Sequence, residues 1–469
     1  MNDAFKSATI SGGKLLEKIV SFSIILMASR HFGSEGIGEF FYYFSTVSLF
    51  IPLMDFGFEK LLMRRWWDKN ETEKKQMLGN IIILKMISGS TSLLFAITVD
   101  FCVRGPESKW QAIVGAFLAI YFDEAGGLFR TPKRVKNIFT LDIISPLISR
   151  ICTLVLFLIT FGEIASGHQF VFIYAASNAV GLLISITGLK GYSPVFNTVS
   201  KPRLIELAKA GLPFSMTSLC VMISLYVDSV MLGYFSISEV GLYNSAYRII
   251  LVVAALSGGT CHVLFPKFIK LKAEGHMAKA SHMFFGVLRI HFIIFGSIAV
   301  GGLLFGAQMM PAIYGDDFSD AGLPFVILSL LVVTVSFTNV IGHTLEAFGM
   351  EKVVMSITMK AALFNFVSNL IFIPVWGMVG AACTTVLTEM VTLIVQFRTL
   401  KKYDVMPWKP KELIRGYLFV IILIPIYLLI PPLNIWLSIA LGAVAFLTLF
   451  FVGKNYWLNG IQIKPEAPK

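Results

Sequence analysis

The sequence predicts an all-α polytopic membrane protein, and three observations lead to this fold class. Apolar stretches long enough to cross a bilayer recur from near Gly12 to Gly453. Hydrophobic residues make up 56% of the chain and charged residues only 14%, whereas about a quarter of the residues of soluble domains are charged. Lysine and arginine gather in every second gap between the apolar stretches. A bilayer, rather than a large soluble core, is therefore the expected environment of these stretches.

About fourteen transmembrane helices are expected, because each needs about 20 predominantly apolar residues. In chain order they begin near residues 12, 37, 78, 109, 140, 168, 205, 241, 285, 322, 353, 378, 412 and 433. No loop between them is expected to exceed about 20 residues, which is too short for a soluble domain of about 50 residues or more. The function is therefore expected to lie within the membrane or at its surfaces.

The positions of the basic residues predict the orientation of the chain. Short loops rich in lysine and arginine stay in the cytoplasm. The gaps around Gly33, Gly162, Ser236 and Asp316 contain neither residue. The basic gaps contain Arg64, Arg65, Lys69, Lys74 and Lys75; Arg130, Lys133, Arg134 and Lys136; Lys190, Lys201 and Arg203; Lys267, Lys270, Lys272 and Lys279; Lys352; and Arg398, Lys401, Lys402, Lys409 and Lys411. Together with the even number of helices, this alternation places both termini in the cytoplasm.

Composition and motifs exclude several other classes. The net charge of +11 does not indicate nucleic-acid binding, because insertion topology explains where the positive residues lie. The five cysteines are scattered and show no spacing typical of a disulfide framework or a zinc site, so no metal or cofactor is expected. Lys14, Glu17 and Lys18 interrupt the first apolar segment, which is a poor match to a cleavable signal peptide.

Weak self-similarity at an offset of 203 residues indicates an internal repeat. Phe32, Ile37, Gly38 and Phe40 align with Phe235, Val240, Gly241 and Tyr243. A chance match in apolar sequence is the alternative, but the offset preserves the inside/outside phase of the loops. We therefore expect an N-terminal lobe of six helices at 1–200, a second at 201–404, and two further helices at 405–469. Parallel repeats of this kind place a transporter's binding site between the two halves.

Short motifs resemble those of the multidrug/oligosaccharidyl-lipid/polysaccharide (MOP) exporter superfamily, and in particular its Wzx-type flippases. The motifs extend over most of the chain, and the last of them is the most specific. They are Ile37-Gly38-Glu39-Phe40, Asp55-Phe56-Gly57, Gly211-Leu212-Pro213, Val240-Gly241-Leu242-Tyr243 with Arg248, Ile313-Tyr314-Gly315, and Ile373-Pro374-Val375-Trp376-Gly377-Met378-Val379-Gly380-Ala381-Ala382. Small residues also let helices pack closely in lipid, so these motifs identify the scaffold better than the substrate.

The resemblance implies a two-lobed, V-shaped helical bundle in the bacterial cytoplasmic (inner) membrane. By alternating access it would move undecaprenyl-diphosphate-linked oligosaccharide to the outer leaflet, for O-antigen lipopolysaccharide, capsule or exopolysaccharide. Its partners would be membrane lipids and, potentially, a polysaccharide polymerase with its chain-length machinery. The sequence has no G-x-x-x-x-G-K-[ST] phosphate loop, so the energy would come from a proton or sodium gradient, the membrane potential or removal of the product.

Cationic residues inside the predicted helices are the candidate ligands of a diphosphate. A charged side chain costs about 2.5 to 3.5 kcal/mol near the membrane centre and usually faces a cavity or the bundle interior. Arg248 is the first choice because it also fits the family pattern, and Arg150 is the second. Lys14 and Lys18 share one helix face at the inner mouth, although snorkelling to the interface explains them equally well. Lys85, Arg289 and Lys360 are further candidates, with interface anchoring as the alternative.

Three acidic residues are candidates for ion coupling. Asp228, Glu389 and Asp55 lie within predicted helices, where a carboxylate can carry a proton or bind sodium. The alternative is that each neutralises a buried cation.

Other functions remain open at this stage. An ion-coupled multidrug or organic-cation antiporter would use the same fold but would be expected to have acids dominating its cavity. A membrane-embedded polymerase or ligase of lipid-linked sugars usually needs a long outer loop, and the outer gaps here are short. A scaffold without transport activity would not explain the arginines inside the helices.

Overall fold

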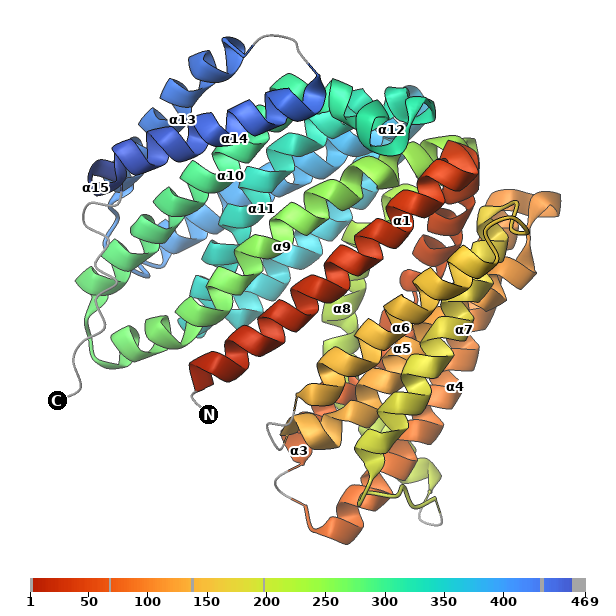
Figure 1. The fold of residues 1–469 in the computed structure, drawn as a ribbon. Helices are drawn as coiled ribbons and strands as arrows, with labels where there is room; N and C mark the ends of the chain where they lie inside the picture. The colour runs from red at the N-terminus through yellow and green to blue at the C-terminus, as the bar shows by residue number, and fades with distance from the viewer. Residues whose placement is uncertain (1–2, 67–68, 136–138, 197–198, 431–433, 458–469) are drawn as a thin grey trace. The chain divides into compact units, whose positions relative to one another are not determined.

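The structure is a computed structural model that describes residues 3–66, 69–135, 139–196, 199–430 and 434–457. Within these ranges every regular element is a helix, which confirms the predicted all-α class (Figure 1). The α-helices are α1 (Asp3–Ser48), α2 (Ile51–Asp55), α3 (Phe58–Arg65), α4 (Glu71–Arg104), α5 (Trp110–Val135), α6 (Thr140–Ile159), α7 (Gly167–Ile186), α8 (Lys201–Phe235), α9 (Ile237–Ala273), α10 (Met277–Tyr314), α11 (Gly322–Ala347), α12 (Glu351–Lys402), α13 (Ile414–Leu428), α14 (Ile435–Val452) and α15 (Lys454–Trp457).

The predicted number of fourteen membrane-spanning helices is not confirmed. Among the described residues, ten helices are long and apolar enough to cross a membrane, or eleven if the bent pair Gly12–Ser48 and Ile51–Arg65 forms one span. With 15 residues, α13 is shorter than the roughly 20 residues that a full crossing needs. The 52-residue α12 covers two of the predicted helices.

Two glycines divide the longest helices where the sequence predicts a boundary. Gly33 in α1 has φ 68° and ψ −174°, and Gly377 in α12 has φ 53° and ψ −132°. A residue with a Cβ rarely adopts such positive φ values, whereas glycine does so at little cost. The chain therefore bends at Gly33 and Gly377 with almost no connecting loop.

Contacts within the chain define two compact units, Met1–Asn244 and Ser245–Lys469. In the first unit α5 and α6 both pack on α7, and α1 contacts α5, α6, α7 and α8. In the second unit α10 packs against α11, α13 and α14, and α11 packs against α12. The predicted division at residues 200 and 404 stays a prediction.

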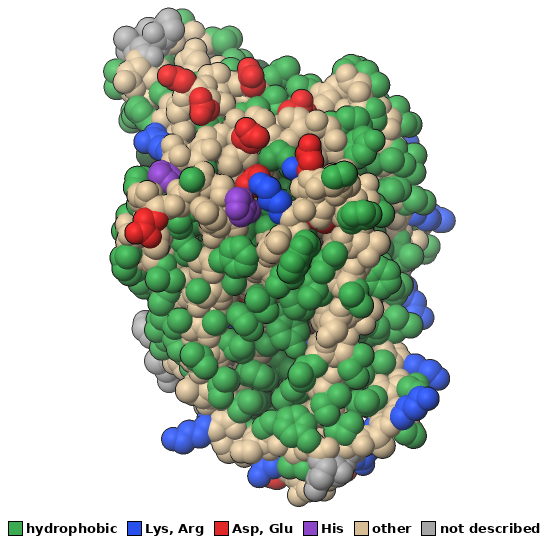
Figure 2. All heavy atoms as spheres, turned by 90° about the vertical axis from the view of Figure 1, so that its right-hand side faces the viewer, with side chains coloured by type: hydrophobic (Ala, Val, Ile, Leu, Met, Phe, Trp, Pro, Cys, Tyr) green, Lys and Arg blue, Asp and Glu red, His purple; other side chains and the backbone are tan. Residues whose placement is uncertain are grey.

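The surface is typical of a protein surrounded by hydrocarbon. Large apolar side chains such as Leu94, which is 67% exposed, point outward, and in water such extensive exposure would favour association. Figure 2 shows the side on which α4 and α7 lie in Figure 1: hydrophobic side chains cover its middle, Lys and Arg border its lower end, and Asp and Glu lie mainly toward its upper end. This is the charge distribution that a basic cytoplasmic side would produce.

Candidate functional site

The residues predicted from the sequence are divided between the two units. Asp55, Lys85, Arg150 and Asp228 lie in the first unit, as do Lys14 and Lys18. Arg248, Arg289, Lys360 and Glu389 lie in the second.

Arg150 on α6 lies at the centre of a charged cluster in the first unit. Its Nε is 3.2 Å from Oε1 of Glu17 on α1, and its Nη2 is 4.0 Å from Oδ2 of Asp123 on α5. Nη1 donates to Oδ1 of Asn178 on α7 at 3.4 Å, and the guanidinium lies 5.3 Å from the ring centroid of Tyr174. The side chain is only 13% exposed. The arginine is therefore inside the helix bundle, as expected, but carboxylates already contact it.

Lys85 on α4 forms a second cluster, with two acids. Its Nζ is 2.6 Å from Oδ1 of Asp55, at the end of α2, and 3.9 Å from Oε2 of Glu124 on α5. The lysine side chain is 2% exposed, so it lies deeper than the alternative role of an interface anchor would require. Lys85, a candidate substrate ligand, and Asp55, a candidate ion-coupling acid, therefore form an ion pair. Because Asp123 and Glu124 are adjacent, α5 supplies an acid to each cluster.

A third network joins four helices of the same unit. Arg134 near the end of α5 contacts Glu59 on α3 and lies 2.5 Å from Asp142 on α6. Arg130 lies 3.3 Å from Asp142 and donates to the hydroxyls of Ser145 and Ser185. In the sequence, these arginines belong to a basic gap between apolar stretches, which predicts a cytoplasmic loop. Their structural role depends on Glu59, which is 75 residues from Arg134, and nothing in a single sequence indicates that pairing.

At the other end of the first unit, Glu39 forms a further network that sequence reasoning missed. Its Oε1 lies 2.5 Å from Nζ of Lys109, just before α5, and its Oε2 lies 3.2 Å from Nδ1 of His168 on α7. Glu39 belongs to the motif Ile37-Gly38-Glu39-Phe40, so that motif contained a signal for this site. Here the acid is the buried partner, since the Lys109 side chain is 42% exposed and that of Glu39 only 14%.

Lys14 and Lys18 differ from these paired cations. Both are exposed on the first half of α1, where their spacing of four residues places them on one face. Within the described part of the chain neither forms an ion pair. They are therefore cationic groups of the first unit that an external anion can reach without displacing a carboxylate.

Asp228 is a buried acid near the C-terminal end of α8. It is 1% exposed, and its Oδ2 accepts a hydrogen bond of 2.7 Å from the Tyr243 hydroxyl. The structure thus gives this ion-coupling candidate a neutral hydrogen-bond donor.

The candidates of the second unit have different surroundings. Arg248 on α9 is half-buried and lies within electrostatic range of Tyr314 on α10. Arg289 is 1% exposed and lies near Arg415 and Glu412, so it is buried in the core, unlike the interface anchor that was its alternative role. Lys360 on α12 is exposed. Glu389, also on α12, accepts a hydrogen bond of 3.1 Å from Thr338.

Amide and hydroxyl side chains connect the two segments of α12 on either side of Gly377. Asn369 donates to Oδ1 of Asn365 at 3.2 Å and accepts a hydrogen bond from Thr384. Asn365 donates to Thr388 at 3.5 Å. These buried groups satisfy one another, as buried polar atoms must, and they hold the two segments side by side.

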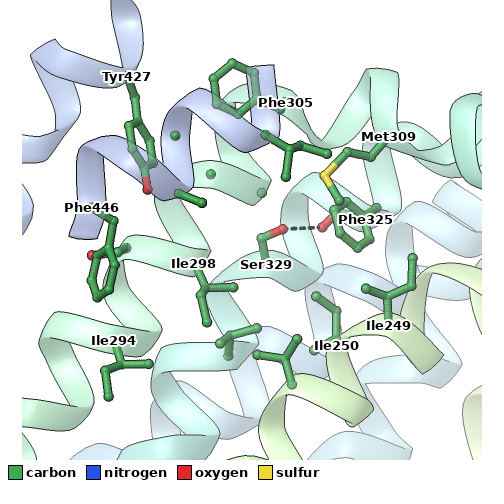
Figure 3. A pocket seen from close by; sticks show the side chains of 18 residues that line it. Ile249, Ile250, Ile294, Ile298, Phe305, Met309, Phe325, Ser329, Tyr427 and Phe446 are labelled. Carbon is green, nitrogen blue, oxygen red and sulfur yellow. Dashed lines mark hydrogen bonds between the residues drawn. The ribbon is translucent and has the colours of Figure 1, made fainter. Parts of the chain in front are cut away.

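The second unit also contains an apolar cavity of about 330 Å³. Figure 3 shows Ile298, Tyr427 and Phe446 around it, with Ser329 donating to the Phe325 carbonyl oxygen at 2.8 Å. It is lined by residues of α9, α10, α11, α13 and α14: Ile249, Ile250, Val253, Ile294, Ser297, Ile298, Gly301, Gly302, Phe305, Met309, Phe325, Ser329, Val332, Tyr427, Ile439, Gly442, Ala443 and Phe446. An almost wholly apolar lining suits a hydrocarbon ligand better than a sugar or an ion. The sequence did not predict this cavity, because its walls come from five helices.

Comparison with known proteins places the chain among membrane proteins of glycan assembly. A family described as "Polysaccharide biosynthesis protein" matches residues 6–272. A protein named "Probable low-salt glycan biosynthesis flippase Agl15", from Haloferax volcanii, is 23% identical over 399 residues, which are 82% of this chain and 80% of that protein.

Solved structures share the fold. A structure described as "Lipid II flippase MurJ, inward closed conformation" has a TM-score of 0.80 at 15% identity and covers 96% of this chain and 99% of its own. An inward-facing multidrug resistance MATE family transporter of the MOP superfamily has a TM-score of 0.64 at 15% identity, covering 83% of this chain and 94% of its own. At these identities the likeness concerns the fold alone.

Proposed function

Because the chain belongs to the polysaccharide biosynthesis protein family, we propose that it is a flippase. Its cargo is a glycan linked through diphosphate to a polyprenyl lipid, and it moves this cargo from the cytoplasmic to the outer leaflet by alternating access. The glycan is a repeating unit of a cell-surface polysaccharide such as O-antigen, capsule or exopolysaccharide. The relative named as a probable glycan biosynthesis flippase supports this cargo class.

The observation that carries the proposal is the exposure of Lys14 and Lys18 on one face of the first membrane helix. Carboxylates contact Lys85 and Arg150 deeper in the first unit, whereas these two lysines are exposed positive charges near the start of α1. A diphosphate entering from the cytoplasmic leaflet would gain about 1 kcal/mol per lysine near the membrane surface. In this account Arg150, Arg248, Arg289, Lys85 and Lys360 contribute later, after capture.

The apolar cavity of the second unit is the proposed contact for part of the prenyl chain. Its lining is hydrocarbon apart from a few hydroxyls, and Ser329 is satisfied by its own helix. Burial of apolar surface is favourable by about 25 cal/mol per Å², so such a cavity can hold a segment of chain while the rest stays in lipid.

Transport, rather than an enzymatic reaction, fits these features. The energy source proposed is a proton or sodium gradient, with Asp228, Glu389 and Asp55 as the candidate coupling acids. Both termini are proposed to lie in the cytoplasm, and a polymerase with chain-length machinery would consume the product outside.

A reconstituted assay tests the proposal. Purified protein is placed in vesicles that carry a fluorescent prenyl-diphosphate disaccharide, and a membrane-impermeant quencher reports the fraction in each leaflet. We expect transfer between leaflets to be faster than in protein-free vesicles, and slower with Lys14→Gln/Lys18→Gln. Transfer at the protein-free rate for the wild type would reject the flippase.

A second candidate function is an ion-coupled antiporter of organic cations. One observation favours it: four carboxylates, those of Glu17, Asp55, Asp123 and Glu124, surround Lys85 and Arg150. In the same vesicles this function predicts gradient-driven exchange of a lipophilic cation and no transfer of the prenyl diphosphate.

A further inference from the structure

The ion pair between Glu17 and Arg150 joins the first half of α1 to α6. Gly13 lies against Ile143 one turn earlier, so the two helices are close where the pair forms. The residues are 133 positions apart in the sequence. The contact thus links two separately inserted helices near the end of α1 that carries Lys14 and Lys18.

Arg150 lies farther from its acids than Lys85 and Arg134 lie from their nearest acids, as does Arg130, which is 3.3 Å from Asp142. The contacts of Arg150 to Glu17 and Asp123 measure 3.2 and 4.0 Å, whereas Lys85 lies 2.6 Å from Asp55 and Arg134 lies 2.5 Å from Asp142. Charge-assisted N–H···O hydrogen bonds are commonly about 2.7 to 2.9 Å long. The contact between Glu17 and Arg150 is therefore longer than a good charge-assisted hydrogen bond, and an anion that binds Arg150 more closely can replace it.

The guanidinium of Arg150 also lacks the geometry that it prefers. An arginine fork matches two oxygens of one carboxylate or phosphate group. Here its nitrogens are divided among Glu17 from α1, Asp123 from α5 and the amide oxygen of Asn178 from α7. A diphosphate offers paired oxygens on a single group and would satisfy the fork better than these three separate side chains do.

Glu17 occupies the place where such a diphosphate would arrive. It is three residues after Lys14, a spacing that makes the two side chains neighbours on the helix, and it directly precedes Lys18 in the chain. Its side chain is 24% exposed, so an incoming anion can reach it. The Glu17 carboxylate repels an anion and competes with it for Arg150.

We propose that Glu17 is an internal substitute for the cargo: it occupies Arg150 in the empty transporter, and the diphosphate of the lipid-linked glycan displaces it. This inference rests on the proposed function and names the group that selects the diphosphate. Displacement releases α1 from α6 at this point, which couples cargo binding to movement of the helix. On release of the cargo, Glu17 returns to Arg150 and lowers the affinity for the departing anion.

Binding measurements on purified protein in nanodiscs test the exchange, with farnesyl diphosphate as the probe. We expect Glu17→Gln to tighten binding about tenfold, the usual value of one charged hydrogen bond, and Arg150→Gln to weaken it by a similar factor. In Glu17→Gln/Arg150→Gln the gain from Glu17→Gln should disappear, because Glu17 then has no arginine to occupy. Glu35→Gln, an exposed acid of the same helix, serves as the matched control and should bind as the wild type does.

Transport kinetics separate an exchange role from a merely structural one. Exchange predicts that Glu17→Gln lowers KM and also lowers kcat, since the product leaves more slowly, while the unfolding temperature changes little. A structural pair predicts a lower unfolding temperature with KM unchanged or raised, which would overturn the inference. If the wild type transports the cargo and Arg150→Gln binds farnesyl diphosphate equally well, this inference fails alone. If the wild type neither binds nor transports prenyl diphosphates, the proposed function fails with it.

Discussion

Gly38 and Gly241 pack against each other's chain segments in a reciprocal contact. A Cβ on Gly38 would overlap the carbonyl oxygen of Ile237, and a Cβ on Gly241 would overlap that of Ser34. The two glycines are 203 residues apart, which is the offset of the predicted repeat. A hydrogen bond of 2.9 Å between the hydroxyls of Ser34 and Ser238 lies beside them. The two aligned turns of the predicted repeat therefore contact each other directly, while the repeat itself stays a prediction.

A methyl group at Gly38 is expected to disrupt this contact. Because the obstacle is backbone and not a flexible side chain, Gly38→Ala should destabilise the protein by about 1 to 3 kcal/mol, lower the unfolding temperature and reduce transport. Gly258→Ala is the control, since no heavy atom lies near the added Cβ and alanine favours a helix by about 1 kcal/mol. Equal unfolding temperatures for the two variants would show that the glycine contact is not needed.

Removal of Lys85 alone should destabilise the protein more than removal of Lys85 together with Asp55. Lys85→Met leaves the carboxylates of Asp55 and Glu124 without their shared cation, and breaking a buried pair in this way costs about 3 to 5 kcal/mol. Lys85→Met/Asp55→Asn should recover part of that loss. Thermal unfolding of the single and double variants in detergent measures it, and additive losses would argue against the pairing.

Charge at positions 14 and 18 should matter more than the identity of the residue. Each of Lys14→Gln and Lys18→Gln should lower kcat/KM for the lipid-linked cargo about fivefold. This factor corresponds to about 1 kcal/mol per basic residue near an anionic surface. The loss of kcat/KM should be smaller at high salt, which screens the charges. Lys14→Arg should retain most activity. Lys270→Gln, on α9 and 70% exposed, is the control; an equal loss there would mean that only overall charge matters.

Filling the apolar cavity should remove sensitivity to the length of the prenyl chain. Ile298 is 40% exposed and lines the cavity, so Ile298→Trp occupies part of its volume. We expect wild-type affinity to rise from a short to a long prenyl diphosphate, and the variant to bind both about equally. Leu304→Trp, on the same helix and 38% exposed but outside the lining, should behave as the wild type. An unchanged length dependence in Ile298→Trp would place the chain elsewhere.

The sequence predicts the scaffold because hydrophobic length and basic loops are local signals. The helical class and the family resemblance are confirmed by the structure and by the family match. The breaks at Gly33 and Gly377 fall at predicted boundaries. The number of spans stays a prediction, since α12 continues through its break over two predicted helices and α13 is short.

Most of the site is not visible in the sequence, because charge pairing depends on which helices become neighbours. Arg150 and Lys85 are recognisable as costly residues inside the membrane, but their acids lie 133 and 30 residues away. Asp123 and Glu124 are not among the residues predicted from the sequence, although an acidic pair within an apolar helix has the same energetic cost in the membrane. The roles of Arg248, Lys360 and Glu389 stay predictions.

The central claim is most directly tested by the distribution of the lipid-linked glycan between leaflets in cells. The protein is depleted, membrane vesicles of known orientation are prepared, and outward-facing sugars are labelled with an impermeant reagent. The account predicts that the lipid-linked unit accumulates on the cytoplasmic leaflet, and that wild-type protein restores its transfer whereas Lys14→Gln/Lys18→Gln does so poorly. An unchanged distribution after depletion would contradict the flippase function and would favour the cation antiporter.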